Sequence, residues 1–157
     1  MPEQREYGAP PQLKNPQRDD YLEAMSKSVF QTGISWAVVD KKWPDIVEAF
    51  HGFDTERVAN LSPDELDELQ QDTRVIRNRR KLEAISSNAQ MVLDRSEEHG
   101  TFREYLAAQG DFDGKVKALK RDFKFLGDTG SYIFLYVVGE EVPPHEEWEA
   151  SRPKRKR

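Results

Sequence analysis

The sequence predicts an all-α protein, and three observations support this fold class. Apolar residues recur at the 3.6-residue period of helices along most of the chain, and two capping boxes mark helix starts. No segment alternates cleanly between apolar and polar residues, as a half-buried strand would. Residues 29–39 and 132–138 are rich in β-branched and aromatic side chains, yet neither has a hairpin partner and helix signals flank both. We therefore expect one helical domain, which suits a length of 157 residues.

The N-terminal third predicts an arm followed by three helices. Residues 1–16 contain four prolines and no helical periodicity, so we expect an extended arm there. The first helical stripe consists of Tyr21, Leu22, Met25 and Val29. Gly33 interrupts this helix, and Ser35 is placed to cap a second one over residues 36–43. Pro44 suits the first turn of a third helix, which would carry Ile46, Val47 and Phe50.

The middle of the chain carries the clearest helix boundaries. Ser62, Pro63 and Glu65 fit the N-cap, N1 and N3 positions of a helix over residues 63–70. The longest apolar stripe follows, and it consists of Leu82, Ile85, Ala89, Val92 and Leu93. Gly100 is placed to end that helix. Thr101 and Glu104 then form a second capping box, for a short helix that Gly110 closes.

The C-terminal third resembles a helix–hairpin–helix at about residues 115–139. A basic helix over 115–121 precedes a tight turn with Gly127, and Thr129 is placed to cap the apolar helix 131–138. In such a motif the backbone N–H groups of the turn and of the following helix bind phosphates without reading bases. A purely structural corner between two helices also needs a glycine, so that alternative stays open.

Composition excludes several classes of protein. The chain has no cysteine, which excludes disulfides, thiol nucleophiles, iron–sulfur clusters and cysteine-ligated zinc. No run approaches 18 apolar residues, so no membrane span is expected. No basic and then apolar leader opens the chain, so we expect a cytoplasmic protein.

Charge is unevenly distributed around the net value of −5. Residues 1–70 hold seven basic and fourteen acidic side chains, whereas residues 74–81 hold five basic ones and no acid. Residues 115–124 hold five basic side chains and one acid, and residues 152–157 hold five basic side chains. Two positive islands and a basic, disordered tail over 151–157 would direct a polyanion to one face. The alternative is that these charges are ordinary solvated helix faces.

Three blocks of sequence resemble the DNA-3-methyladenine glycosylase I family of the helix–hairpin–helix DNA glycosylase superfamily. Residues 30–36 read Phe-Gln-Thr-Gly-Ile-Ser-Trp, which is similar to the family's Gln-Ala-Gly-Leu-Ser-Trp. Residues 76–81 and 123–127 are similar to its Ile-Arg-Asn-Arg-x-Lys helix and its Phe-Lys-Phe-Val-Gly hairpin. The blocks keep the family order. The resemblance implies a helix–hairpin–helix DNA glycosylase-like helical domain over residues 17–150.

The resemblance also implies a reaction and a set of site residues. A monomeric enzyme of this kind would flip an alkylated purine such as 3-methyladenine out of double-stranded DNA and hydrolyse its N-glycosidic bond in base excision repair. An N3-methylated base is cationic and leaves as a neutral group, so flipping and stacking on aromatic rings are the main requirements. The implied catalytic or base-reading residues are Ser28 and Gln31, and the implied pocket aromatics are Trp36, Tyr21 and Tyr7. Gly33 and Ile34 would form a wedge. The DNA-binding residues would be Arg77, Arg79, Lys81, Lys120, Lys124, Gly127 and Thr129. Packing in the core is the alternative for Tyr21, Trp36 and Ile34.

Departures from the family pattern leave activity and metal content in question. The family's pocket glutamate corresponds to Ser28, and neither Glu23, about 140° away around the helix, nor Asp20, more than two turns away, is expected to replace it. A catalytic aspartate of other superfamily members corresponds to Pro143. Of the family's zinc clasp only His145 remains, with Glu149 at a cysteine position. We therefore expect no metal or other cofactor, and a hydrogen-bonding structural role for His145. The second functional hypothesis is a non-catalytic helix–hairpin–helix protein that binds DNA or damaged bases without cleaving them.

Overall fold

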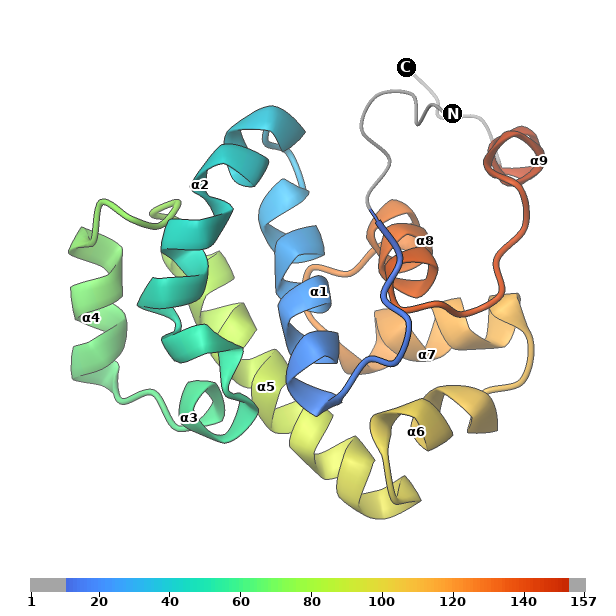
Figure 1. Ribbon diagram of the computed structural model, residues 1–157, viewed down its shortest axis with the longest axis horizontal. Coiled ribbons are helices and arrows are strands. Elements are labelled where there is room, and N and C mark those ends of the chain that lie inside the picture. Colours follow the sequence, from blue (N-terminus) through green and yellow to red (C-terminus); the bar gives the residue numbers. More distant parts are fainter. Residues whose placement is uncertain (1–10, 153–157) are drawn as a thin grey trace.

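The computed structural model describes residues 11–152, and every regular element in that range is helical (Figure 1). The predicted fold class is therefore confirmed. The helices are α1 (Arg18–Gln31), α2 (Trp36–Ala49), the 3-10 turn η2 (His51–Phe53), α3 (Thr55–Ala59), α4 (Pro63–Gln71), α5 (Arg79–His99), α6 (Phe102–Ala108), α7 (Phe112–Asp122), α8 (Asp128–Val137) and α9 (His145–Ser151).

Helices α1 and α5 organise the core. Helix α5 packs against α1, α3, α4 and α6, and α1 packs against α2, α5 and α8 (Figure 1). The predicted apolar stripes supply the contacts, because Leu22, Met25, Leu82 and Ile85 are all completely or almost completely buried. Burial of apolar side chains on both helices stabilises this arrangement through the hydrophobic effect.

Most helix starts follow the sequence signals. Ser35 Oγ accepts a hydrogen bond from the Val38 backbone N–H at 3.4 Å, as expected for the N-cap of α2. Ser62 and Glu65 form the predicted capping box of α4. Gly100 ends α5 with a φ of +99°, a value that glycine adopts without the steric cost of a Cβ.

Three details differ from the sequence predictions. Pro44 lies inside the continuous helix α2 and does not begin a third helix, because Trp43 and Ile46 on either side of it face the core. Gly127, and not Thr129, is the N-cap of α8, since the helix begins one turn earlier than its apolar stretch. Helices α3 and α9 were not predicted, as each is too short to show a clear apolar period.

The segments at both ends of the described chain lie on α8. The backbone N–H of Leu13 donates to the carbonyl oxygen of Val137 at 2.8 Å, so residues 11–16 run along the end of α8. At the other end, the Trp148 ring stacks on Tyr132 of α8 with centroids 4.4 Å apart. Residues 1–10 and 153–157, which include most of the predicted arm and tail, lie outside the described residues.

Candidate functional site

Two adjoining cavities form a groove between α1, the start of α2 and α8. Their volumes are about 480 and 450 Å³, and both are lined by Ser28, Gln31, Trp36 and Ile133. Because four residues are shared, the two cavities form one continuous groove. Volumes of this size are typical of small-molecule sites.

The turn between α1 and α2 places the shared residues at the centre of the groove. Gly33 has a φ of +77°, which allows the chain to reverse sharply after Gln31, the last residue of α1. Trp36 then begins α2 and keeps 36% of its surface exposed. Trp36 is therefore a groove residue and not a core residue. Ser28 is 4% exposed, but it lines both cavities.

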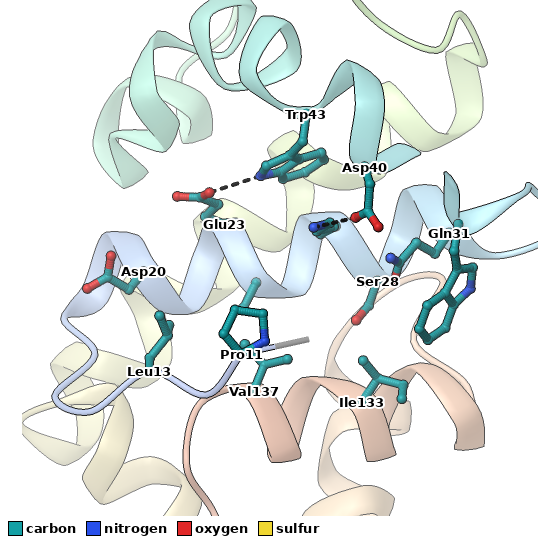
Figure 2. A pocket seen from close by; sticks show the side chains of 13 residues that line it. Pro11, Leu13, Asp20, Glu23, Ser28, Gln31, Asp40, Trp43, Ile133 and Val137 are labelled. Carbon is teal, nitrogen blue, oxygen red and sulfur yellow. Dashed lines mark hydrogen bonds and ion pairs between the residues drawn. The ribbon is translucent and has the colours of Figure 1, made fainter. Parts of the chain in front are cut away.

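Helix α8 approaches α1 closely at Ser28. A Cβ added to Gly130 would lie 3.9 Å from the Cβ of Ser28 and 3.4 Å from a methyl group of Leu126. Because Gly130 and Ser28 are small, α8 and α1 can meet beneath the groove. The wall opposite α1 is then completed by Ile133 and Val137 of α8 (Figure 2).

The first cavity is rich in carboxylates, two of which, Asp20 and Glu23, the sequence analysis set aside. Asp20, Glu23 and Asp40 all line it (Figure 2), and among the described lining residues Lys27 is the one cation. Lys27 Nζ lies 2.7 Å from an oxygen of Asp40, so the remaining charge of the cavity is negative. Asp20 and Glu23 therefore share a cavity with Ser28, although they lie at other points of α1. The cavity extends along α1 from Asp20 to Gln31.

Glu23 is held in a defined orientation within this cavity. The indole N–H of Trp43 donates a hydrogen bond to Glu23 Oε2 at 2.9 Å. Trp43 is itself fixed by stacking on Phe53, with ring centroids 5.5 Å apart. A charged acceptor shortens and strengthens such a bond. The signal for this contact, a tryptophan twenty residues after Glu23, was not recognisable from helical spacing.

The second cavity opens toward the hairpin between α7 and α8. Gly33 of the α1–α2 turn lines it, together with Phe125, Gly127 and Thr129 of the hairpin and α8. Phe125 has a φ of +60° and is 37% exposed, and the Arg80 guanidinium lies 6.0 Å from its ring centroid. The structure thus brings the predicted wedge glycine and the predicted phosphate-binding turn to one groove.

One of the predicted base-pocket aromatics, Tyr21, lies away from the groove. Tyr21 lines neither cavity; it is 2% exposed and packs on Phe102 and Phe134, with centroids 5.1 and 6.4 Å away. Tyr21 belongs to the core, because α6 and α8 cover its face of α1. Tyr7 lies outside the described residues. Ile34, the predicted wedge, is half-buried against the core.

The predicted DNA-binding cations divide into exposed and occupied groups. Arg77 and Lys124 are exposed, as expected for phosphate contacts. Arg79 is held by Asp67 and Glu83 at 2.7 and 2.9 Å. Lys120, which is exposed, pairs with Asp128 at 2.8 Å.

Lys81 departs most from its predicted role as a surface contact. It is 5% exposed, and its ammonium donates to the backbone carbonyls of Phe30 and Thr32 at the end of α1. Burial lowers the pKa of this ammonium. The pattern of charges in the sequence did not predict that Lys81 is buried. Its ammonium stabilises the C-terminus of α1 and the turn that carries Gly33.

A buried carboxylate network supports the first hairpin helix. Asp122, the last residue of α7, accepts hydrogen bonds from the Tyr105 hydroxyl at 2.7 Å and from Arg95 Nε at 3.2 Å, and it also pairs with Arg121. The Arg121 guanidinium, with help from Tyr105 and Arg95, lowers the pKa of Asp122 to about 2. The network ties α7 to α5 and α6.

No cluster of three or more metal-ligating side chains occurs within residues 11–152. His145 is exposed, lies 3.9 Å from Glu149, and packs edge-on against Tyr132 with centroids 5.6 Å apart. The helices between residues 11 and 152 also include none that is long and apolar enough to cross a membrane.

Comparisons with known proteins give a consistent result. Residues 5–119 match the family described as methyladenine glycosylase. DNA-3-methyladenine glycosylase 1 of Escherichia coli K12 is 33% identical, with 69% of this chain and 70% of that protein covered. A crystal structure of 3-methyladenine DNA glycosylase I superposes with a TM-score of 0.72 at 29% identity, covering 81% of each chain. A single-residue variant of such an enzyme, in complex with 3-methyladenine, also gives 0.72 at 26% identity, covering 83% and 80% of the two chains.

Proposed function

This chain belongs to the methyladenine glycosylase family, and on that premise we propose that it excises alkylated adenine from DNA in base excision repair. The substrate class is double-stranded DNA with an N-alkylated purine such as 3-methyladenine. The protein acts as a monomer in the cytoplasm, where the chromosome of a bacterial cell lies.

The observation that carries this proposal is the groove centred on Trp36. Its exposed indole stands at the junction of a cavity lined by carboxylates and a cavity that opens to the hairpin. A flipped purine would enter the first cavity while the hairpin holds the backbone. The negative charge of the first cavity favours a cationic base over a neutral one.

Cleavage of such a base needs little acid or base chemistry. The bond between the sugar C1′ and the purine nitrogen breaks, and its electron pair neutralises the positive charge of the methylated ring. Water then adds to the oxocarbenium-like sugar and releases a proton. Trp36 stacks on the base, Gln31 and Ser28 offer hydrogen bonds to its edge, and Glu23 supplies fixed negative charge.

Contacts to the DNA backbone follow from the same placement. Arg77, Lys124 and Lys120 supply exposed cations, and the turn at Gly127 with Thr129 supplies backbone N–H groups. Arg79 and Lys81 are not part of this set, because two carboxylates hold Arg79 and Lys81 is buried, whereas Lys120 is exposed and has one exposed partner. Gly33 and Ile34 would form the wedge that fills the gap left by the base.

Ser28 favours one alternative, a protein that binds damaged DNA without cleaving it. A serine hydroxyl offers a hydrogen bond to a base but no charge to stabilise a cationic transition state. In that case the carboxylates of the first cavity would serve recognition alone.

The decisive experiment compares free-base release from a duplex containing 3-methyladenine with a gel shift on the same duplex. We expect release by the wild-type protein, and slower release by Glu23→Gln at unchanged affinity for undamaged DNA. Ser28→Glu should raise the rate. Ser28→Gln introduces a side chain of the same shape as glutamate but no charge, so it should not raise the rate. Binding with no base release by the wild type would establish the non-catalytic alternative.

A further inference from the structure

Arg152 is held at the edge of the groove by a stack of flat side chains. Its guanidinium lies 4.5 Å from the ring centroid of Trp148, and Trp148 in turn stacks on Tyr132 of α8 with centroids 4.4 Å apart. The Tyr132 hydroxyl donates to the carbonyl oxygen of Pro143, and this bond ties the Tyr132 ring to the loop before α9. Because each group is fixed by the next, the guanidinium has few orientations left to lose on binding.

This guanidinium faces the hairpin side of the groove. Arg152 lines the second cavity, and its Nη1 lies 3.4 Å from the Thr129 hydroxyl oxygen. Among the described residues that line this cavity, Arg152 alone is cationic. The other charged group there, Asp128, is already paired with Lys120.

The ion pair between Arg152 and its acidic partner, Glu149, is weak. Glu149 lies 3.5 Å from Arg152, and 59% of the Glu149 side chain is exposed. An exposed ion pair contributes little to stability, so a phosphate of the DNA backbone, which can accept hydrogen bonds from the planar guanidinium, would replace it. Beyond Arg152 the sequence adds four further basic residues and no acid.

We propose that Arg152 is a DNA-phosphate contact, positioned by Trp148 and Tyr132 so that a backbone phosphate is held between α9 and the start of α8. The proposal rests on the proposed function only in assuming that the groove receives DNA. It gives α9 a role in binding the duplex, next to the hairpin but separate from it.

The test is salt-dependent binding of an undamaged duplex by the full-length protein. We expect Arg152→Gln to weaken binding about fivefold to tenfold near 0.1 M salt, and to lower the slope of log K against log salt by about 1. Arg152→Lys should keep most of the slope, since the charge remains, but should bind more weakly because the planar stack is lost. Glu149→Gln should bind more tightly than the wild type.

The matched control is Arg18→Gln. Arg18 also pairs with one exposed glutamate, Glu56, at 3.6 Å, but it lines neither cavity. An affinity and a slope for Arg152→Gln equal to those of Arg18→Gln would overturn the proposal, provided that circular dichroism shows the same melting temperature for both. Base release from methylated duplex is measured in parallel. Loss of slope without base release by the wild type would keep the Arg152 contact and reject the enzymatic function.

Discussion

Asn88 and Lys124 exchange two hydrogen bonds. The Asn88 amide nitrogen donates to the carbonyl oxygen of Lys124 at 3.1 Å, and the backbone N–H of Lys124 donates to the amide oxygen of Asn88 at 2.9 Å. Asn88 is 2% exposed in the middle of α5, so one buried side chain fixes the hairpin turn on the central helix. The position of the hairpin turn relative to the groove therefore depends on this amide.

We expect Asn88→Ala to destabilise the protein and to weaken DNA binding together. Loss of the amide leaves the N–H and C=O groups of Lys124 without their partner, which costs about 1–3 kcal/mol. Urea unfolding and a gel shift measure the two effects. Ser87→Ala, an exposed neighbour on α5, should change neither; wild-type affinity in Asn88→Ala would show that the turn is positioned by other contacts.

Gly127→Asp should separate stability from DNA affinity. A Cβ at this position would meet no heavy atom within 4 Å, and the φ of −89° is open to any residue. Asp is also a good N-cap residue, so the free energy of unfolding should stay equal or rise by a few tenths of a kcal/mol. DNA affinity should fall, because a negative side chain blocks the close approach of a phosphate. Gly127→Ala separates bulk from charge, and undiminished affinity in both variants would mean that the hairpin is only a structural corner.

Trp36→Ala should reduce recognition of the damaged base more than it reduces DNA binding. Stacking of a base on an aromatic ring contributes about 1–3 kcal/mol, so we expect the ratio of damaged to undamaged affinity to fall roughly tenfold to a hundredfold. Val38→Ala is the matched control, because Val38 is 48% exposed on the same helix and lines neither cavity. If the ratio of damaged to undamaged affinity in Trp36→Ala equals that in Val38→Ala, the damaged base does not bind at Trp36.

The pH dependence of stability should reveal Asp122. Its pKa falls from the ordinary value of 3.8 to about 2 in the folded protein, so the carboxylate stabilises the fold fully above pH 3.8 and loses this contribution as the pH falls through 2. We expect Asp122→Asn to lower the free energy of unfolding on the order of 2 kcal/mol at pH 7, and by much less near pH 2. Urea unfolding across this range measures the difference. Asp113→Asn removes one exposed charge from the same helix and is the control; a pH-independent loss in Asp122→Asn would contradict the ionic origin.

Chelation should leave the protein intact. No three ligating side chains cluster among the described residues, and His145 has only Glu149 near it on α9. The melting temperature should therefore be equal with and without EDTA. Stoichiometric zinc in elemental analysis of protein purified without a histidine tag would refute this expectation.

Helix boundaries could be predicted to the extent that they depend on neighbours in sequence. Ser35, Ser62 and Gly100 act on backbone groups within a few residues, so their roles could be recognised before the fold was known. Pro44 and Thr129 were wrongly predicted to mark helix starts, because local signals alone did not fix where these helices begin. A proline or a threonine is compatible with a helix start, but packing of the flanking residues decided where the helices begin.

The sequence by itself determined the helical fold class, the order of the three family blocks and the presence of Trp36 at the start of a helix. These features depend on periodicity and on local backbone chemistry. The tertiary structure alone decided that Lys81 is buried at the end of α1, that Tyr21 belongs to the core, and that Asp20 and Glu23 share a cavity with Ser28. Periodicity gives the direction of a side chain on its own helix, but burial, charge pairing and cavity shape depend on what the neighbouring helices place opposite it.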